Sequence, residues 1–297
     1  MAWSEADIPD QSGRTAVVTG ANSGIGWDTA RALAAKGARV VLGCRHETKG
    51  RDAEERIRRR VPNADVRFEA LDLGSLASVR RFAEKLAAEE AHLDLLVNNA
   101  GVMMTPRGKT ADGFETQFGT NHLGHFALTG LLLDKVRVAP GARVVTLSSL
   151  IHFTGRIDFD DLQAERSYDP SRAYGQSKLA NLLFARELAR RFQAAGIPAL
   201  SVAAHPGSTR TELQRHSRLM AAAVRLVSQL PPQGALPSLY AATAPDVRGG
   251  EYFGPSRAFG MLGPPDRARS SPRSQDVATA RRLWEVSEQL TGVRFGI

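Results

Sequence analysis

Residues 15–26 have the sequence Thr-Ala-Val-Val-Thr-Gly-Ala-Asn-Ser-Gly-Ile-Gly, and this stretch decides the fold. Its first part, Thr15 to Val18, is a short apolar run typical of a buried strand, and Asp28 to Lys36 further along has the composition of a helix. Glycines at such a strand–turn–helix junction permit a tight turn and let the backbone approach a pyrophosphate at the helix N-terminus. The spacing G-x-x-x-G-x-G departs from G-x-G-x-x-G, so a glycine turn without a ligand is the alternative.

Strand-like and helix-like segments alternate along the rest of the chain. The expected strands are Thr15 to Val18, Arg39 to Leu42, Val66 to Leu71, Leu93 to Val97, Arg143 to Leu147, Ala199 to Ala203 and Glu251 to Phe253. The expected helices include Asp28 to Lys36, Glu47 to Arg60, Val79 to Ala88 and Phe126 to Val136. Strands separated by helices form βαβ units with right-handed crossovers. We therefore predict an α/β fold, a Rossmann-like doubly wound parallel sheet of about seven strands with helices on both faces.

Length and composition indicate one globular domain. The 297 residues contain no Ser/Gly/Pro-rich linker and no repeat, so we expect a single domain over residues 1–297. Residues 1–12 are polar and lack an apolar signal-peptide core, which predicts a loose tail and a cytoplasmic protein. No apolar run approaches the ~20 residues of a membrane span. The single cysteine, Cys44, excludes an internal disulfide and a cysteine-based zinc site.

The net charge of +8 raises the question of an anionic partner. The arginines alternate with acidic residues along predicted helices, as in Ala53 to Arg60, which is typical of solvated helix faces rather than of a nucleic-acid surface. A cofactor that carries several phosphates is the simpler use of a local positive charge. His122 and His125 have no cysteine, histidine or acidic cluster around them in the sequence, so we expect no metal site.

Polar residues follow the predicted strands at the edge where ligands bind in open α/β sheets. After the second strand stands Arg45, with no acidic residue before Glu47. An arginine can pair with a ribose 2′-phosphate, whereas an acid there would bind the 2′-hydroxyl of NAD, so NADP(H) is favoured and NAD(H) stays open. The third, fourth and fifth strands are followed by Asp72-Leu73, by Asn98-Asn99-Ala100-Gly101 and by Ser148-Ser149.

Tyr174 and Lys178 lie four residues apart in a segment with strong helix signals. Asp169-Pro170 predicts the start of this helix, and Gly196 with Pro198 predicts its end. Residues four apart share one helix face, so a phenol and an ammonium are placed together, a pair suited to proton transfer. Taken alone, the pair favours a half-buried tyrosine beside a solvated lysine, because Y-x-x-x-K occurs often by chance.

Taken in order, these motifs resemble the short-chain dehydrogenase/reductase family, and the surrounding sequence is similar to its retinol-dehydrogenase-like branch. The resemblance extends from about Gly13 to Val293. It is carried by Gly20-x-x-x-Gly24-x-Gly26, Asn98-Asn99-Ala100-Gly101, Asn121-His122-Leu123-Gly124-His125-Phe126, Ser148-Ser149-Leu150-Ile151-His152, Tyr174-x-x-x-Lys178-Leu179-Ala180-Asn181, Pro206-Gly207 and Ala280-Arg281-Arg282-Leu283-Trp284.

The resemblance implies catalytic roles for four residues. Tyr174 would be the acid in carbonyl reduction and the base in alcohol oxidation, and Lys178 would bind the nicotinamide ribose and favour the tyrosinate. Ser149 would orient the substrate oxygen, with Ser148 structural, because an extra loop over Ile151 to Ser171 separates the serines from Tyr174. Asn121 would hold a water molecule in a proton relay.

The resemblance also implies a cofactor-binding set spread over the strand ends. Its members are Gly20, Ser23, Gly24, Ile25, Gly26, Arg45, Asp72, Leu73, Asn99, Ala100, Gly101, Tyr174, Lys178, Pro206, Gly207 and Thr209, with Thr211 as an alternative to Thr209. The apolar stretch Leu219 to Leu230 is expected to be a substrate lid or a packing segment, with a membrane-surface helix as the alternative.

The sequence thus predicts an NADP(H)-dependent oxidoreductase that interconverts a carbonyl and an alcohol on a fairly apolar small molecule. Two alternatives stay open: a catalytically idle NADP(H)-binding sensor or scaffold, and a C=C reductase of the protochlorophyllide-reductase type. The only cysteine, Cys44, is expected at the adenosine end, which disfavours the C=C chemistry. A homo-oligomer is left open.

Overall fold

The computed structural model describes residues 2–209 and 228–297. Within these ranges, one sheet of eight strands has the order β3-β2-β1-β4-β5-β6-β7-β8. The strands are β1 Thr15–Thr19, β2 Arg39–Cys44, β3 Val66–Ala70, β4 Leu95–Asn98, β5 Arg143–Leu147, β6 Leu200–Ala204, β7 Tyr252–Arg257 and β8 Leu262–Arg267. Strands β1 to β7 pair in parallel, and the order reverses between β1 and β4. The predicted Rossmann-like, doubly wound sheet is confirmed.

The eighth strand was not predicted. It pairs antiparallel with β7 and lies at the edge of the sheet, with Pro255 opposite Pro265. Its sequence, Leu-Gly-Pro-Pro-Asp-Arg, shows no alternation of apolar and polar residues. Proline lacks the N–H that a central strand needs, so such a sequence forms a strand only at an edge or a bulge.

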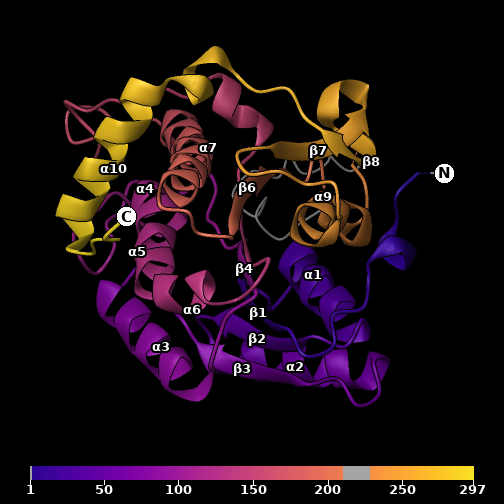
Figure 1. Cartoon of the computed structure of the whole chain (residues 1–297). Helices are drawn as coiled ribbons and strands as arrows, with labels where there is room; N and C mark the ends of the chain where they lie inside the picture. Colours follow the sequence, from indigo (N-terminus) through magenta and orange to yellow (C-terminus); the bar gives the residue numbers. More distant parts are fainter. Residues whose placement is uncertain (1, 210–227) are drawn as a thin grey trace.

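Helices cover both faces of the sheet (Figure 1). Helices α1 Gly24–Ala35 and α9 Pro231–Thr243 lie on one face, and α3 Leu76–Glu89, α5 Gly124–Leu131 and α7 Pro170–Ala194 lie on the other. The remaining helices are η1 Glu5–Asp7, α2 Glu47–Arg60, α4 Thr116–Phe118, η2 Gly119–Leu123, α6 Leu133–Arg137, η3 Leu150–Phe153, η5 Ala258–Gly260, η6 Pro272–Gln275 and α10 Val277–Thr291, which packs outside α7.

The neighbouring residues Val17 and Val18 explain why the first strand is apolar from Ala16 to Val18. Val18 belongs to the core under α1 and α9, whereas Val17 belongs to the core under α3, α5 and α7. Successive strand side chains point to opposite faces, so a sheet that is covered on both faces needs apolar residues at every position.

Two predicted helices differ from those observed. Helix α1 begins at Gly24, four residues before the expected Asp28, because the glycine turn itself forms the first helical turn. The segment expected as Phe126 to Val136 is divided into α5 and α6, because Leu132 has φ −98° and ψ 3°, outside the helical range. Helix α7 begins as predicted: the Asp169 carboxylate caps it, accepting a hydrogen bond of 2.7 Å from the backbone N–H of Arg172.

Residues 2–12 are packed rather than loose. Ile8 is buried in the core, and the Trp3 ring meets the edge of Tyr240 on α9 at 5.2 Å between centroids. Glu5 forms an ion pair of 2.6 Å with Arg31 on α1. The polar composition of residues 1–12, from which a loose tail was predicted, gives no indication of these few contacts. In the described part of the chain, no helix combines the length and apolarity needed to cross a membrane.

Candidate active site

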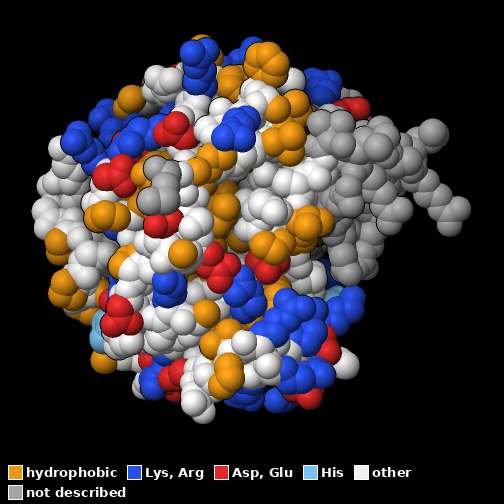
Figure 2. Space-filling model, turned by 90° about the vertical axis from the view of Figure 1, so that its right-hand side faces the viewer, with side chains coloured by type: hydrophobic (Ala, Val, Ile, Leu, Met, Phe, Trp, Pro, Cys, Tyr) orange, Lys and Arg blue, Asp and Glu red, His pale blue; other side chains and the backbone are white. Residues whose placement is uncertain are grey.

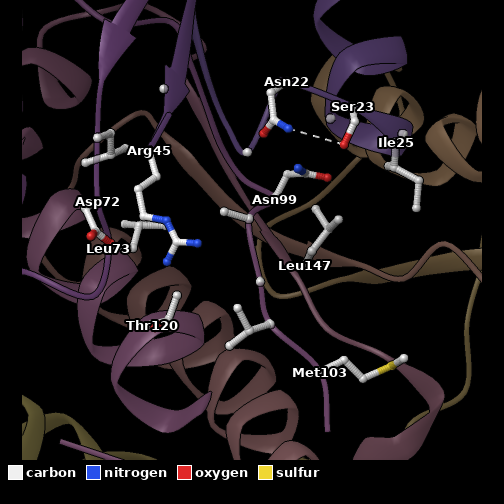
Figure 3. A pocket seen from close by; sticks show the side chains of 18 of the residues that line it. Asn22, Ser23, Ile25, Arg45, Asp72, Leu73, Asn99, Met103, Thr120 and Leu147 are labelled. Atoms are coloured by element: carbon white, nitrogen blue, oxygen red, sulfur yellow. Dashed lines mark hydrogen bonds between the residues drawn. The ribbon is translucent and has the colours of Figure 1, made fainter. Parts of the chain in front are cut away.

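The carboxyl ends of β1 to β5 surround a cleft at the point where the strand order reverses, the position at which open α/β sheets bind ligands (Figure 3). Its lining combines the glycine turn, the residues that follow β2 to β5, and one face of α7. The lining residues that the sequence predicted are Gly20, Ser23, Gly24, Ile25, Gly26, Arg45, Asp72, Leu73, Asn99, Ala100, Gly101, Tyr174, Lys178 and Pro206.

Backbone geometry explains the glycines of the turn. Gly20 and Gly24 have φ of +67° and +56°, the left-handed region that other residues rarely adopt. A Cβ on Gly20 would lie 2.9 Å from the Cα of Ala100, and one on Gly26 would collide with the Asn99 side chain. The Asn99 amide donates a hydrogen bond of 2.7 Å to the Thr19 carbonyl, so Asn99 ties β4 to β1 and also faces the cleft.

The N-terminus of α1 opens into this cleft. Its N-cap residue, Ser23, makes no capping hydrogen bond, and no acidic residue lies in the first turn. The Asn22 amide lies beside the Ser23 hydroxyl, 3.4 Å away (Figure 3). Free N–H groups and the helix dipole together favour an anion at such an end.

The side of the cleft next to β2 is exposed and basic. Arg45, His46 and Lys49 line it, and Arg45 lies across the cleft from Ser23 and Ile25 (Figure 3). Figure 2 shows Lys and Arg side chains gathered over the lower part of one face of the molecule. The acid nearest to Arg45 in the sequence, Glu47, forms an ion pair of 2.8 Å with Arg51. Among described residues, neither Arg45 nor Lys49 has a carboxylate within ion-pair distance.

Asp72 and Leu73 form the wall next to β3. The Asp72 carboxylate accepts a hydrogen bond of 2.9 Å from the backbone N–H of Gly74, which stabilises the turn after the strand. The Leu73 side chain is buried, and Thr120 from η2 lies below it in the cleft (Figure 3). A flat apolar ring can bind here against Leu73.

Tyr174 and Lys178 lie at the inner end of the cleft. Both side chains are almost fully buried, and the Lys178 Nζ is 5.7 Å from the centre of the Tyr174 ring. Burial raises the pKa of Tyr174 to about 12, with a hydrogen bond from Ser149 acting in the opposite direction. Burial also lowers the pKa of Lys178 to about 8. Near neutral pH this site therefore holds a protonated phenol beside an ammonium group.

The two serines after β5 face different partners. The Ser148 hydroxyl is buried and donates a hydrogen bond of 2.7 Å to the backbone carbonyl of Lys178. Ser149 is half-buried, caps η3, and places its hydroxyl at the Tyr174 hydroxyl. Ser148 therefore anchors β5 to α7 and also lines the cleft, whereas Ser149 does not line it but is the serine that hydrogen-bonds to Tyr174.

Asn121 lies in the π-helix η2, a distortion that often marks functional sites. Its side chain accepts a hydrogen bond of 2.8 Å from the Val102 N–H and donates to the Val102 carbonyl at 2.9 Å. It also donates to the Ser177 hydroxyl at 3.0 Å. These bonds clamp the loop after β4 against α7, and the side chain does not line the cleft.

Two predicted cofactor residues, Gly207 and Thr209, lie outside the cleft. Gly207 packs against the Met261 carbonyl, and the Thr209 hydroxyl donates to the Pro206 carbonyl at 2.8 Å, so neither lines the cleft. Thr211 and most of the expected lid, from Leu219 to residue 227, lie outside the described residues. His122 and His125 are buried and bond to different hydroxyls, those of Ser287 and Thr19.

The sequence reasoning missed several lining residues. They are Asn22, Gly43, His46, Lys49, Leu71, Thr105, Thr120 and Leu147, besides the structural Ser148. Lys49 was detectable, because it lies in the first turn of the helix predicted from Glu47, directly after the end of β2. Thr120 carried no signal, since its position depends on how η2 packs.

Comparisons with known proteins agree with this geometry. A family model described as short chain dehydrogenase matches residues 14–222. Retinol dehydrogenase 12 from Homo sapiens is 48% identical over 288 residues, which cover 95% of this chain and 88% of that protein. The structure of an uncharacterized protein from Mycobacterium paratuberculosis has a TM-score of 0.84 and 45% identity, with full coverage of both chains. A Pseudomonas aeruginosa RhlG/NADP active-site complex has a TM-score of 0.65 and 26% identity over 82% of this chain and 94% of that one.

Proposed function

This chain belongs to the short chain dehydrogenase family of nicotinamide-dependent oxidoreductases, and we propose that it is an NADP(H)-dependent enzyme that interconverts a carbonyl and an alcohol on a fairly apolar small molecule. The observation that carries the proposal is the buried pair of Tyr174 and Lys178, with the half-buried Ser149 beside Tyr174, at one end of a cleft whose other end is basic. A proton donor and a phosphate-binding surface are the two things that hydride transfer requires of a protein.

The residues present fit a dinucleotide phosphate. The glycine turn lines the cleft, Gly20 and Gly26 let it pack directly against Ala100 and Asn99, and the uncapped start of α1 faces the same space. Arg45 and Lys49 would hold a 2′-phosphate, since neither has an acidic partner among the described residues. Leu73 would contact the adenine, and Lys178 the nicotinamide ribose. The complex of RhlG with NADP, on a related chain, is consistent with this choice.

The bound nicotinamide would supply or accept a hydride at carbon. Ser149 and Tyr174 would hold the substrate oxygen between their hydroxyl groups, and the Tyr174 Oη–H would donate its proton to the developing alkoxide. Because the pKa of Tyr174 is about 12, the donor is fully protonated at pH 7, which is the state that carbonyl reduction requires. Lys178, with a pKa of about 8, would stay charged and stabilise the tyrosinate left behind.

An apolar substrate fits the rest of the wall. Val102 and Met103 line the cleft beside Tyr174, and Leu150 and Phe153 follow Ser149 in η3. Methionine adapts to irregular apolar ligands, which suits a site for an aliphatic chain or ring. Retinol dehydrogenases 11, 12 and 13 are among the relatives, so retinal is one aldehyde to test.

The proposal is tested with a panel of aldehydes, ketones and alcohols, retinal included, assayed at 340 nm with each cofactor. We expect NADPH-dependent reduction of apolar aldehydes or ketones at pH 7. Absence of turnover across the panel, with NADPH still bound, would favour a sensor or scaffold. Turnover with NADH at least equal to that with NADPH would contradict the cofactor assignment.

A further inference from the structure

His152 lies in η3, three residues after Ser149, and is completely buried. Its Nδ1 is 2.7 Å from the Ser149 carbonyl oxygen, and its Nε2 is 3.1 Å from the backbone nitrogen of Ser271. A backbone N–H can only donate, so Nε2 must be the unprotonated acceptor and Nδ1 must carry the hydrogen. The two contacts therefore fix one neutral tautomer, which donates to Ser149.

The surroundings of His152 keep this ring neutral and in place. Tyr252 meets it edge-on at 5.5 Å between centroids, and Phe153 packs against it at 4.4 Å. His205 lies on the Tyr252 ring, 5.1 Å away. Burial lowers the pKa of His152, and the positive charge of Arg186 acts in the same direction. A protonated ring would lose the hydrogen bond from Ser271.

Ser271 is itself held to α7, the helix that carries Tyr174. Arg186 of α7 donates hydrogen bonds to the Ser274 carbonyl at 2.9 Å and to the Ser270 hydroxyl at 3.0 Å. The Ser274 hydroxyl donates to the Ser271 carbonyl at 2.6 Å. Hydrogen bonds thus connect Tyr174, through its helix and the segment from residue 270 to 274, to His152 and back to Ser149.

We propose that His152 is a positioning residue, which sets the distance between the Ser149 and Tyr174 hydroxyls by holding the Ser149 backbone to the segment that Arg186 anchors. The role depends on the proposed function only in its effect on turnover. It also answers a problem posed by the sequence: 25 residues separate Ser149 from Tyr174, and the loop between them cannot by itself fix the spacing. Hydroxyl groups that share one substrate oxygen must be placed to within about 0.5 Å.

Two substitutions separate the two contacts of the ring. In His152→Asn the side-chain amide nitrogen takes the place of Nδ1 and can still donate to Ser149, whereas in His152→Gln the amide reaches only the position of Nε2. Each substitution breaks the connection between Ser149 and the segment from residue 270 to 274, so we expect both to lower kcat 10- to 100-fold, with NADPH affinity unchanged by nicotinamide fluorescence. The control His92→Asn, at a half-exposed histidine, should stay within about 3-fold of the wild type. A normal kcat in either His152 variant would overturn the role.

A measurement without turnover tests the geometry itself. Long-range ¹H–¹⁵N correlation spectra of the wild-type protein at pH 7 should show His152 as the neutral tautomer with its hydrogen on Nδ1. A hydrogen on Nε2, or a protonated ring, would refute the proposal. If no carbonyl substrate is reduced, the proposed function fails, whereas this spectrum still decides the arrangement of His152.

Discussion

The two ends of the cleft use charge in opposite ways. At the end next to β2, Arg45 and Lys49 are exposed cations on the surface. At the other end, Lys178 is an almost fully buried cation, and burial lowers its pKa to about 8. Exposed charges act in high dielectric and are screened by salt, whereas a buried charge costs several kcal/mol and is maintained by the fold.

This difference indicates which property of the protein depends on each end of the cleft. Exposed cations can change preference between cofactors at little cost to stability, because they pack against nothing. The buried pair of Tyr174 and Lys178 cannot change without altering both proton transfer and folding. The ends should therefore respond differently to substitution, salt and pH, and the following experiments test that contrast in order of decreasing effect.

Removal of the Tyr174 hydroxyl should have the largest effect. Tyr174→Phe keeps the buried ring but deletes the proton donor, so we expect kcat to fall about 10³-fold or more while NADPH binding stays within a few-fold. The assays are turnover at 340 nm and cofactor fluorescence. Tyr240→Phe, at a hydroxyl that bonds to Asp246 on the surface, is the matched control. A normal rate in Tyr174→Phe would remove Tyr174 from the mechanism.

Lys178→Met should make the protein more stable at neutral pH although it impairs catalysis. The folded pKa of about 8 lies below the ordinary 10.5, so the unfolded state binds the proton more tightly, and the wild type is destabilised below pH 8. The difference of about 2.5 units corresponds to about 3 kcal/mol at most. This penalty disappears as pH rises from 8 to about 10.5.

Urea unfolding of both proteins at pH 7 and pH 10 measures this effect. We expect Lys178→Met to have the higher free energy of unfolding at pH 7, and this difference to shrink at pH 10. At both pH values the variant also loses roughly 1 kcal/mol with the hydrogen bond from Lys178 to the Leu147 carbonyl. A difference in the free energy of unfolding that is independent of pH would show that burial does not destabilise the charged form of Lys178. The contrast between the two ends of the cleft would then fail.

The sequence predicted the sheet because its signals are local. A strand buried on both faces is apolar along its middle, as Ala16 to Val18 is, and a tight glycine turn needs glycines at fixed spacing. Strand β8 was not predicted, because an edge strand needs neither an apolar run nor glycines at fixed spacing. The break between α5 and α6 was not predicted either, because leucine, as at Leu132, normally continues a helix. These two errors depend on tertiary packing, which no short window of sequence records.

In the candidate site, too, features set by local sequence were predicted and features set by tertiary packing were not. Residues fixed by a strand end, such as Arg45 and Asp72, line the cleft as predicted, since topology alone carries them there. Thr209 and Asn121 do not line it, because their side chains are engaged by nearby backbone groups. The position of His152 depends on a segment more than 100 residues away, which local sequence cannot specify.

Ser149→Ala should cost about 10²-fold in kcat/KM, less than Tyr174→Phe, because it removes orientation of the substrate oxygen but leaves the proton donor. Ser148→Ala should instead lower the free energy of unfolding by about 1 kcal/mol or more, since it deletes a buried hydrogen bond to the Lys178 carbonyl. Kinetics and urea unfolding of both variants measure the two effects. The reverse order of activity loss would exchange the roles of the two serines.

Arg45→Ala should have the smallest effect and only on the choice of cofactor. Loss of one exposed charge opposite a 2′-phosphate should weaken NADPH binding about 10-fold and leave NADH binding unchanged, with kcat at saturating NADPH retained. Salt screens such a contact, so the wild-type advantage of NADPH should itself narrow between 0.05 and 0.5 M NaCl. Arg59→Ala, on α2 beside Glu55, removes an equally exposed charge that does not line the cleft and should change neither constant. If Arg45→Ala and Arg59→Ala lose the same affinity, general surface charge rather than Arg45 selects the cofactor, and the exposed end of the cleft has no specific phosphate contact there.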